Sequence, residues 1–490
     1  MKRNLLRTLA LSTAATLGSM GMSAQTADAS VVEALTAALN KASEIGDLYL
    51  KSIPFAGETA RTAIEKTLPE SIANVEELAK QFADAEAASA YVDEEIAKIE
   101  EALLSDIEAK ATAGDAFSFE FVDIAEEGLP PYFSTSLSAV DNSSAGFITT
   151  KEISAGNLFR AEAKDDLDNG HKSYTFYTVN SNQTVNNSSW NGGGNFSTNT
   201  YGTHSNAFPL SFALKDGYVQ LIVIADANSN ALAFNTDKGY ARAYNKEDSK
   251  TLFKLQAYST SEVAGMAAEQ IAKWGSLVPE GDKVAETVNA NISAAENVAG
   301  ISSLMAEAQE TLLANILAGP AMIKSAATDL YIGYEDGWWA NFEKEEAPEW
   351  SFTSSQKYPS YTLMKDDAAG KYIGWGLGAS DTPVDNENSW NNGYYVIVLD
   401  NPGNITIFKP GSTNGFQVSG EQLVSADVMG ERYINGIENY SFAFEHKAGS
   451  VAVGNIEAEG NSGVVYDLMG RRVANPGKGL YIVDGKKVMK

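Results

Sequence analysis

The sequence predicts a multidomain α and β protein, in which three-helix-bundle modules alternate with all-β modules and a small β unit ends the chain. Three observations lead to this fold class. Residues 30–112 and 261–327 are rich in Ala and Glu and carry apolar residues at helical spacing. Residues 113–260 and 328–447 shift to Asn, Ser, Thr, Gly and aromatic residues, which is typical of strands and turns. The 490 residues are also too many for one ordinary domain.

The composition excludes several classes of function. The chain has 36 basic and 64 acidic residues and a formal net charge of −28, so we expect no general phosphate-neutralising surface for nucleic acid. The absence of cysteine excludes disulfides, thiolate nucleophiles and Cys-based zinc sites. Hydrophobic residues make up 44% of the chain, which is enough for real cores and excludes a wholly disordered protein.

Residues 1–29 have the pattern of a secretory signal peptide. Lys2, Arg3 and Arg7 precede a modestly apolar stretch over 9–22, and small residues within 24–30 offer two candidate cleavage sites. A retained amphipathic helix is the alternative. No later stretch is long and apolar enough for a membrane span, so we expect a secreted or cell-surface protein.

Residues 30–112 are predicted to form about three helices. Pro54 and Pro69 are expected to divide the region, because proline is costly inside a helix. The longest apolar stripe at helical spacing consists of Val92, Ile96, Ile99, Leu103 and Ile107.

Residues 261–327 repeat this helical character. Gly281 and Gly300 are expected at helix boundaries, and Pro320 near the end of the last helix. In length and in their Ala/Glu/Leu content, both helical regions resemble the FIVAR-like three-helix spacer modules of bacterial surface proteins. A plain amphipathic bundle is the alternative.

The β modules contain clear strand signals and an internal echo. Residues 218–224 are predicted to form a buried strand, and 394–399 with 405–408 indicate a hairpin. Residues 232–255 align without gaps on 330–353, with agreement mainly at aromatic and charged positions. This unit resembles the repeat of ricin-type β-trefoils. A β-sandwich would produce the same strands and turns, so it stays open.

Tryptophans in polar surroundings are the candidate ligand contacts. Ser-Trp-Asn occurs twice in Asn-rich loops, and an indole face can stack on a sugar while amides bond its hydroxyls. The adjacent pair Trp338 and Trp339 should point to opposite faces of a strand, which leaves one free to be at the surface. The predicted ligand-binding residues are Trp190, Asn191, Trp338, Trp390 and Asn391. The alternative is that the loop tryptophans fill equivalent core positions in two related modules.

No catalytic signature is present in the sequence, and we expect no cofactor and no metal. His171, His204 and His446 are the only histidines, and they are interpreted as loop or linker residues. The acidic runs at 165–170 and 385–388 fit calcium loops poorly and are interpreted as solvated turns. With 64 acidic residues, no carboxylate pair for glycoside hydrolysis can be selected.

Residues 463–490, after a linker at 448–462, form the most specific pattern in the chain. Strands are predicted at 464–468, 480–483 and 486–489, with a tight Asp-Gly turn between the last two. The segment resembles the type A C-terminal sorting domain of the Bacteroidetes type IX secretion system. The residues that carry this resemblance include Gly470, Arg471, Arg472, Gly479, Tyr481, Gly485, Lys486 and Lys487. The resemblance implies export and surface display, with the export machinery as a partner; a generic terminal hairpin is the alternative.

Together these features predict a secreted or cell-surface binding or adhesion protein without enzymatic activity. Its β modules would bind an extracellular glycan or a host protein. Two rival hypotheses remain: a glycan-active hydrolase whose carboxylates cannot be located from sequence, and a structural surface-layer component.

Overall fold

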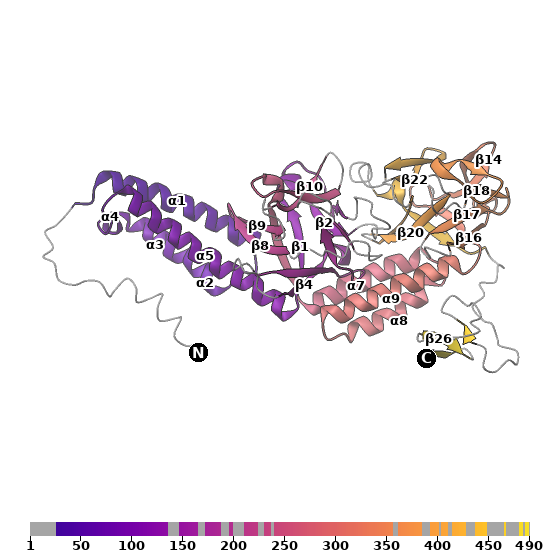
Figure 1. Cartoon of the computed structure of the whole chain (residues 1–490), viewed down its shortest axis with the longest axis horizontal. Coiled ribbons are helices and arrows are strands. Elements are labelled where there is room, and N and C mark those ends of the chain that lie inside the picture. Colours follow the sequence, from indigo (N-terminus) through magenta and orange to yellow (C-terminus); the bar gives the residue numbers. More distant parts are fainter. Residues whose placement is uncertain are drawn as a thin grey trace. The chain divides into compact units, whose positions relative to one another are not determined.

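The computed structural model describes residues 26–135, 147–164, 172–187, 196–198, 210–223, 230–236, 240–355, 361–384, 393–400, 403–409, 414–427, 437–447, 465–466, 480–483 and 486–489 (Figure 1). The chain divides into two compact units. The helical unit comprises the residues up to Leu48 and Gly57–Leu103, and the large unit comprises Tyr49–Ala56 and the chain from Leu104 onward. At the coarse level the expected fold class is confirmed, because the described residues form helices and antiparallel sheets.

The N-terminal helices agree with the predicted apolar pattern. They are α1 (Ala29–Ser52), α2 (Glu58–Thr62), α3 (Leu68–Ala73), α4 (Val75–Ala79) and α5 (Ala85–Ala113), with a π-helical turn η2 (Ala63–Thr67) between α2 and α3. The predicted stripe on α5 is buried at Val92, Ile99, Leu103 and Ile107, and Ile96 is half-buried. This burial is what holds such a helix in place, since helices gain most of their stability from packing an apolar face.

The prediction that Pro69 breaks this region is wrong. Pro69 lies in the first turn of α3, inside a helical run that continues from α2 through η2. Proline is tolerated in a first turn, and the π-helical geometry just before it changes the hydrogen-bond register where the proline N–H is missing. Pro54 does fall in a break, between α1 and α2.

The first β module contains twelve of the described strands. They are β1 (Ala116–Phe121), β2 (Tyr132–Thr135), β3 (Phe147–Thr150), β4 (Phe159–Ala163), β5 (Tyr174–Thr178), β6 (Val185–Asn187), β7 (Phe196–Thr198), β8 (Leu210–Lys215), β9 (Tyr218–Val223), β10 (Asn230–Asn235), β11 (Tyr240–Asn245) and β12 (Phe253–Tyr258). Antiparallel pairing joins β1, β4, β5, β8, β9 and β12 into a closed ring. The other six strands form the hairpins β2–β3, β6–β7 and β10–β11. A short helix, α6 (Val122–Glu126), follows β1.

The second β module repeats this connectivity. Its strands are β13 (Met322–Ser325), β14 (Tyr331–Glu335), β15 (Trp338–Phe342), β16 (Trp350–Ser354), β17 (Thr362–Asp366), β18 (Lys371–Ile373), β19 (Ala379–Ser380), β20 (Tyr394–Asp400), β21 (Asn404–Phe408), β22 (Asn414–Ser419), β23 (Gln422–Asp427) and β24 (Phe442–Glu445). A ring runs through β13, β16, β17, β20, β21 and β24, with β21 and β24 in contact. The hairpins are β14–β15, β18–β19 and β22–β23.

Six strands of each module form a ring, which strand pairing closes in the first module and contact between β21 and β24 completes in the second. The internal echo falls on equivalent strands, because 232–255 covers β10, β11 and the start of β12, and 330–353 covers β14, β15 and most of β16. The second module begins at β13, earlier than the expected boundary at 328.

Three helices connect the modules: α7 (Thr260–Ser276), α8 (Gly281–Ser293) and α9 (Val298–Leu317). They pack on one another, and their buried residues belong to one continuous core with residues of both β modules. On α7, Gln270 accepts a hydrogen bond from the Gly156 N–H of the first module at 3.0 Å, and the Trp274 indole donates to the Asp400 carbonyl of the second at 2.8 Å. Although the sequence suggested a spacer, these helices are an integral joint between the two β modules.

The C-terminal strands form where they were predicted. β25 (Val465–Tyr466), β26 (Leu480–Val483) and β27 (Lys486–Met489) make a three-stranded antiparallel sheet. β26 and β27 pair in a register that places Val483 opposite Lys486, as a tight two-residue connection requires. Among the described residues, no helix combines the length and the apolar character needed to cross a membrane.

Candidate functional site

Most of the predicted site residues fall outside the described residues. These are Trp190, Asn191, Trp390 and Asn391 among the ligand contacts, and Gly470, Arg471, Arg472, Gly479 and Gly485 in the sorting pattern. The histidines His171 and His204 and the acidic runs at 165–170 and 385–388 are also outside them. Tyr481 lies in β26, and Lys486 and Lys487 lie in β27. Trp338 is therefore the predicted ligand contact whose surroundings the structure describes.

Trp338 is held at the start of β15 by a tight hairpin turn. Asp336 and Gly337 both have positive φ angles, 48° and 102°, which matches the right-handed twist of the two strands. Trp338 pairs with Glu335 across the turn. The Trp338 side chain is 52% exposed and that of Trp339 is 3% exposed, so the prediction that they point to opposite faces is confirmed.

Buried aromatic rings support this hairpin from below. The Trp339 ring lies 5.2 Å from the Trp350 ring and 5.1 Å from the Tyr334 ring, between centroids. The Trp350 indole donates to the Ile332 carbonyl at 2.8 Å, which fixes β14, the first strand of the same hairpin. The Trp339 indole N–H also has an acceptor, the Leu377 carbonyl. Because the Trp339 and Trp350 rings are packed and both of their indole N–H groups are hydrogen-bonded, the backbone that carries Trp338 is held rigidly.

A buried carboxylate fixes the next turn to the hairpin. Asp366, at the end of β17, accepts hydrogen bonds from the Tyr334 N–H at 2.8 Å and the Ala369 N–H at 2.9 Å. Lys371 follows that turn, forms an ion pair with Asp381 at 2.5 Å and lies 5.8 Å from the centre of the Tyr334 ring. One side chain thus positions two neighbouring hairpins of the second module.

A second exposed tryptophan was missed by the sequence analysis. Trp375 is 51% exposed, and it opens a short 3₁₀ turn, η5 (Trp375–Leu377), between β18 and β19. In the described part of the chain, Trp338 and Trp375 are the large hydrophobic side chains that are exposed. The signal that could have found Trp375 is the run Gly-Trp-Gly-Leu-Gly at 374–378, since a tryptophan between glycines lacks the apolar neighbours of a core position.

The turn that carries Trp375 is strained and firmly held. Gly376 and Leu377 both adopt left-handed backbone angles, with φ values of 61° and 63°. For leucine this conformation costs roughly 1–2 kcal/mol. The Leu377 carbonyl accepts a hydrogen bond from the Trp339 indole at 2.7 Å, and the Gly374 carbonyl accepts one from the Tyr395 hydroxyl at 2.8 Å. Two buried side chains from other strands therefore maintain an unfavourable loop conformation.

A charged cluster lies where β13, β14 and β24 meet. Glu445 accepts hydrogen bonds from the Tyr331 hydroxyl at 2.9 Å and from Lys344 at 2.6 Å. Burial acts to raise the pKa of Glu445, but these two hydrogen bonds outweigh it and lower the pKa below its ordinary value. Nearby, Lys324 pairs with Asp329 at 2.5 Å. Each carboxylate here has a cationic partner, which is the arrangement of a structural network rather than of a general acid.

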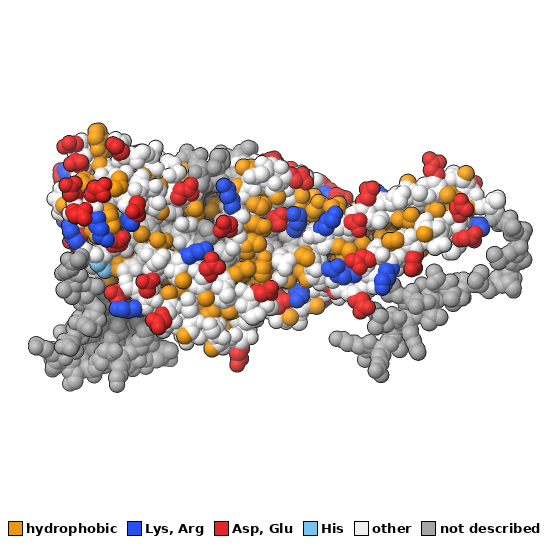
Figure 2. Space-filling model, turned by 180° about the vertical axis from the view of Figure 1, so that it is seen from behind, with side chains coloured by type: hydrophobic (Ala, Val, Ile, Leu, Met, Phe, Trp, Pro, Cys, Tyr) orange, Lys and Arg blue, Asp and Glu red, His pale blue; other side chains and the backbone are white. Residues whose placement is uncertain are grey.

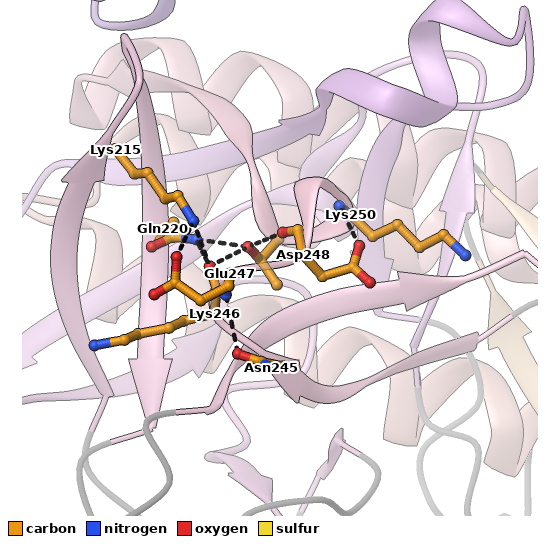
Figure 3. A network of polar contacts seen from close by, with 8 residues as sticks. Lys215, Gln220, Asn245, Lys246, Glu247, Asp248 and Lys250 are labelled. Carbon is orange, nitrogen blue, oxygen red and sulfur yellow. Dashed lines mark hydrogen bonds and ion pairs between the residues drawn. The ribbon is translucent and has the colours of Figure 1, made fainter.

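The first β module contains a polar network at the loop between β11 and β12 (Figure 3). The buried Gln220 side chain donates to the Lys246 carbonyl at 2.7 Å and to the Thr251 hydroxyl at 2.6 Å. Lys215 donates to Glu247 at 2.6 Å, and this hydrogen bond lowers the pKa of the Glu247 carboxyl. These hydrogen bonds attach the loop to β8 and β9. None of the residues labelled in Figure 3 is aromatic, so this network offers no exposed aromatic ring to a ligand.

On the face shown in Figure 2, acidic and basic side chains are both scattered over the surface, with hydrophobic side chains between them. Within the described ranges, no three His, Asp or Glu side chains gather in an arrangement suited to a metal ion. His446 is half-buried, and its Nδ1 lies 2.7 Å from the Pro320 carbonyl.

No family model matches the chain, and no curated protein matches it. Similar solved structures include a mosquitocidal holotoxin, with 9% identity over 68% of this chain and 34% of its own length, and a TM-score of 0.26. The GlcNAcα1-4Gal-releasing endo-β-galactosidase of Clostridium perfringens has 10% identity over 68% of this chain and 72% of its own, with a TM-score of 0.22. The hemolytic lectin CEL-III has 10% identity over 64% of this chain and 63% of its own, with a TM-score of 0.20. The chain spans about a third of the holotoxin, and at such TM-scores these likenesses carry no argument.

Proposed function

We propose that this chain is a non-enzymatic, extracellular glycan-binding protein whose second β module contacts the ligand through Trp338. The observation that carries the proposal is the exposed indole on a rigid hairpin. An exposed tryptophan face gives up apolar burial in the free protein, so a ligand that covers it regains that free energy.

The chemistry around Trp338 favours a neutral sugar. Its neighbours are the polar and charged residues Glu335 and Asp336, which can hydrogen-bond hydroxyl groups at the edge of a ring stacked on the indole. A strongly anionic polymer is disfavoured by the net charge of −28. A large apolar protein partner would be expected to meet a wider hydrophobic patch than a single side chain provides.

We further propose that both β modules are β-trefoils. The support is the connectivity, in which every four successive strands contribute two strands to a six-stranded ring and two to a hairpin. This arrangement repeats three times in each module. The residues of the Trp338 hairpin turn are exposed, so a small ligand can reach them.

Export and surface display are also proposed. The signal-peptide pattern of 1–29 and the resemblance of 463–490 to a type IX sorting domain support them, as does the three-stranded sheet formed by β25, β26 and β27. Fractionation of producing cells should find the chain outside the cytosol and shortened at its N-terminus. Deletion of 463–490 should redirect it away from the surface. Uncleaved full-length chain in the cytosol would refute this proposal.

A glycan array probed with the labelled chain tests the binding function. The expected result is selective binding to neutral glycans that Trp338→Ala abolishes and Trp338→Phe partly retains, with unchanged circular dichroism for both variants. Comparison of Trp338→Ala with Trp338→Phe distinguishes the loss of an aromatic stacking surface from a general effect of substitution at this position. Absence of binding to every glycan, or full binding by Trp338→Ala, would refute the proposed site.

A further inference from the structure

The hairpin of β14 and β15 has two faces of different character. The two strands pair without interruption along the whole of β15, so successive side chains point to opposite faces throughout. Ile332 and Trp339 lie on one face, and both belong to the central core of the module. The opposite face of β15 carries Trp338, Ala340 and Phe342. We call it the outer face, because it holds the exposed Trp338 indole.

A second aromatic ring lies on the outer face, one turn of the pleat beyond Ala340. Phe342 is half-buried, and it lies with Pro348 directly on Gly333, which pairs with Ala340 across the hairpin. A Cβ at Gly333 would lie 2.7 Å from Cε2 of Phe342 and 2.5 Å from Cγ of Pro348, well inside ordinary carbon contacts. The glycine therefore lets both rings rest on the backbone of β14, which fixes the position of Phe342 before any ligand arrives.

The surface between the two aromatic rings is flat and uncharged. Trp338 and Phe342 are four residues apart on one strand, which places their Cα atoms about 13 Å from each other. The residues between them on this face are Ala340 and Gly333, which carry no charge and little or no side chain. A neutral ligand longer than one sugar ring matches such a surface in both charge and length.

A polar side chain stands beside this surface. β23 pairs with β15 on the side away from β14, and Gln422 lies opposite Ala340 in that pairing. Residues directly opposite each other in an antiparallel pair point to the same face, so Gln422 projects next to Ala340 on the outer face. Its side chain is exposed, and a primary amide can both donate and accept hydrogen bonds. The outer face thus combines two aromatic rings with an amide between them.

We infer that the outer face of β15 is an extended oligosaccharide site, in which Trp338 stacks on one sugar, Phe342 contacts another, and Gln422 bonds hydroxyl groups between them. The inference rests on the proposed function and extends it from a single sugar contact to a chain of sugars that lies along the strand. A single sugar reaches one ring, whereas an oligosaccharide forms its second contact at high effective concentration and binds more tightly.

The test first follows each tryptophan separately in the full chain. Incorporation of 5-fluorotryptophan gives one ¹⁹F signal for each of the seven tryptophans, and Trp→Phe variants assign them. The probes are soluble neutral hexasaccharides (cellohexaose, maltohexaose, xylohexaose and mannohexaose) and the corresponding monosaccharides. One hexasaccharide should shift the Trp338 signal with an affinity at least about tenfold higher than that of its monosaccharide. The signals of the buried Trp274 and Trp350 should stay in place.

Matched variants then locate the second contact. Phe342→Leu keeps an apolar side chain over Gly333 but removes the ring, so it should weaken hexasaccharide binding about tenfold and leave monosaccharide binding unchanged. Phe342→Tyr should bind the hexasaccharide normally, and Gln422→Ala should weaken its binding about fivefold. Phe352→Leu is the control and should bind normally, because Phe352 is also half-buried but packs against the core and Phe444.

The outcomes distinguish this inference from the proposed function. If a hexasaccharide shifts the Trp338 signal but Phe342→Leu binds it normally, the inference is overturned and the proposed function stands. The same conclusion follows if Phe342→Leu weakens hexasaccharide and monosaccharide binding alike, or if Phe352→Leu weakens hexasaccharide binding as much as Phe342→Leu does. If no probe shifts the Trp338 signal, both are overturned.

Discussion

The close contact between α7 and α8 makes a sharp prediction about Gly281. A Cβ at position 281 would lie 2.8 Å from the Gly275 Cα and 2.9 Å from its carbonyl carbon, well inside the 3.5–4.0 Å of ordinary carbon contacts. The obstructing atoms are backbone, so they cannot rotate away. Gly281→Ala therefore requires the two helices to separate, which disturbs the joint between the β modules.

The magnitude follows from two opposing effects. Overpacking of this kind costs about 1–3 kcal/mol. The loss of unfolded-state freedom when glycine becomes alanine returns about 0.4–1 kcal/mol. The net expectation is a destabilisation of about 0–2.6 kcal/mol, with a central value of about 1.3 kcal/mol. Gly265, in the interior of α7 with no atom within 4 Å of its would-be Cβ, is the matched control. Gly265→Ala should stabilise the protein by about 0.5–1 kcal/mol.

Urea unfolding followed by tryptophan fluorescence measures both variants. The fully buried Trp274 lies on α7 beside Gly275 and reports on this joint. Midpoints are compared rather than extrapolated free energies, because a chain of this size is not expected to unfold in one step. The midpoint should fall for Gly281→Ala and rise for Gly265→Ala. Equal midpoints for the two variants would show that α7 and α8 do not approach as closely as described.

Three further outcomes are expected from the second module. Trp339→Phe keeps an aromatic ring but leaves the Leu377 carbonyl without its indole donor, so the Trp375 ¹⁹F signal should broaden or shift; an unchanged signal would refute the link. Asp366→Asn leaves the buried side chain with one acceptor oxygen for two backbone N–H groups and should cost about 1–3 kcal/mol in urea unfolding, whereas the exposed Asp367→Asn should change the midpoint little. Burial lowers the pKa of Lys409 from 10.5 to about 8, so the charged form is disfavoured in the folded state. Lys409 also donates a hydrogen bond to the Tyr394 carbonyl that Met cannot replace, so the prediction concerns the pH dependence. The stability of Lys409→Met relative to the unsubstituted chain should be highest below pH 8 and should fall as pH rises toward 10.5; a difference independent of pH would contradict this.

Local patterns in the sequence predicted local structure well. The strand bounds 480–483 and 486–489 follow from an apolar run and an Asp-Gly pair, and both depend only on neighbouring residues. The opposite exposure of Trp338 and Trp339 follows from the two-residue period of a strand. The stripe on α5 follows in the same way from the helical period.

Features that depend on distant residues were not predictable in this way. β13 was assigned to the helical region because its strand partner, β24, lies more than a hundred residues later. The shared core around Trp274 likewise depends on strands of a separate module. Trp375 is a different case, because its local signal, a tryptophan between glycines at 374–378, is compositional and has no helical or strand period.

The two β modules use their aromatic residues differently, which bears on where binding occurs. In the first module, Phe119 packs against Phe133, Phe159, Phe176 and Phe253, with ring centroids 5.3–6.2 Å apart. These rings stabilise a core and are unavailable to a ligand. In the second module, two buried tryptophans hold two exposed ones in place. Because α7 bonds to both modules, this helix joins the packed first module to the second. Under the proposed function, indoles held by buried rings would lose less entropy on binding a ligand than mobile side chains would.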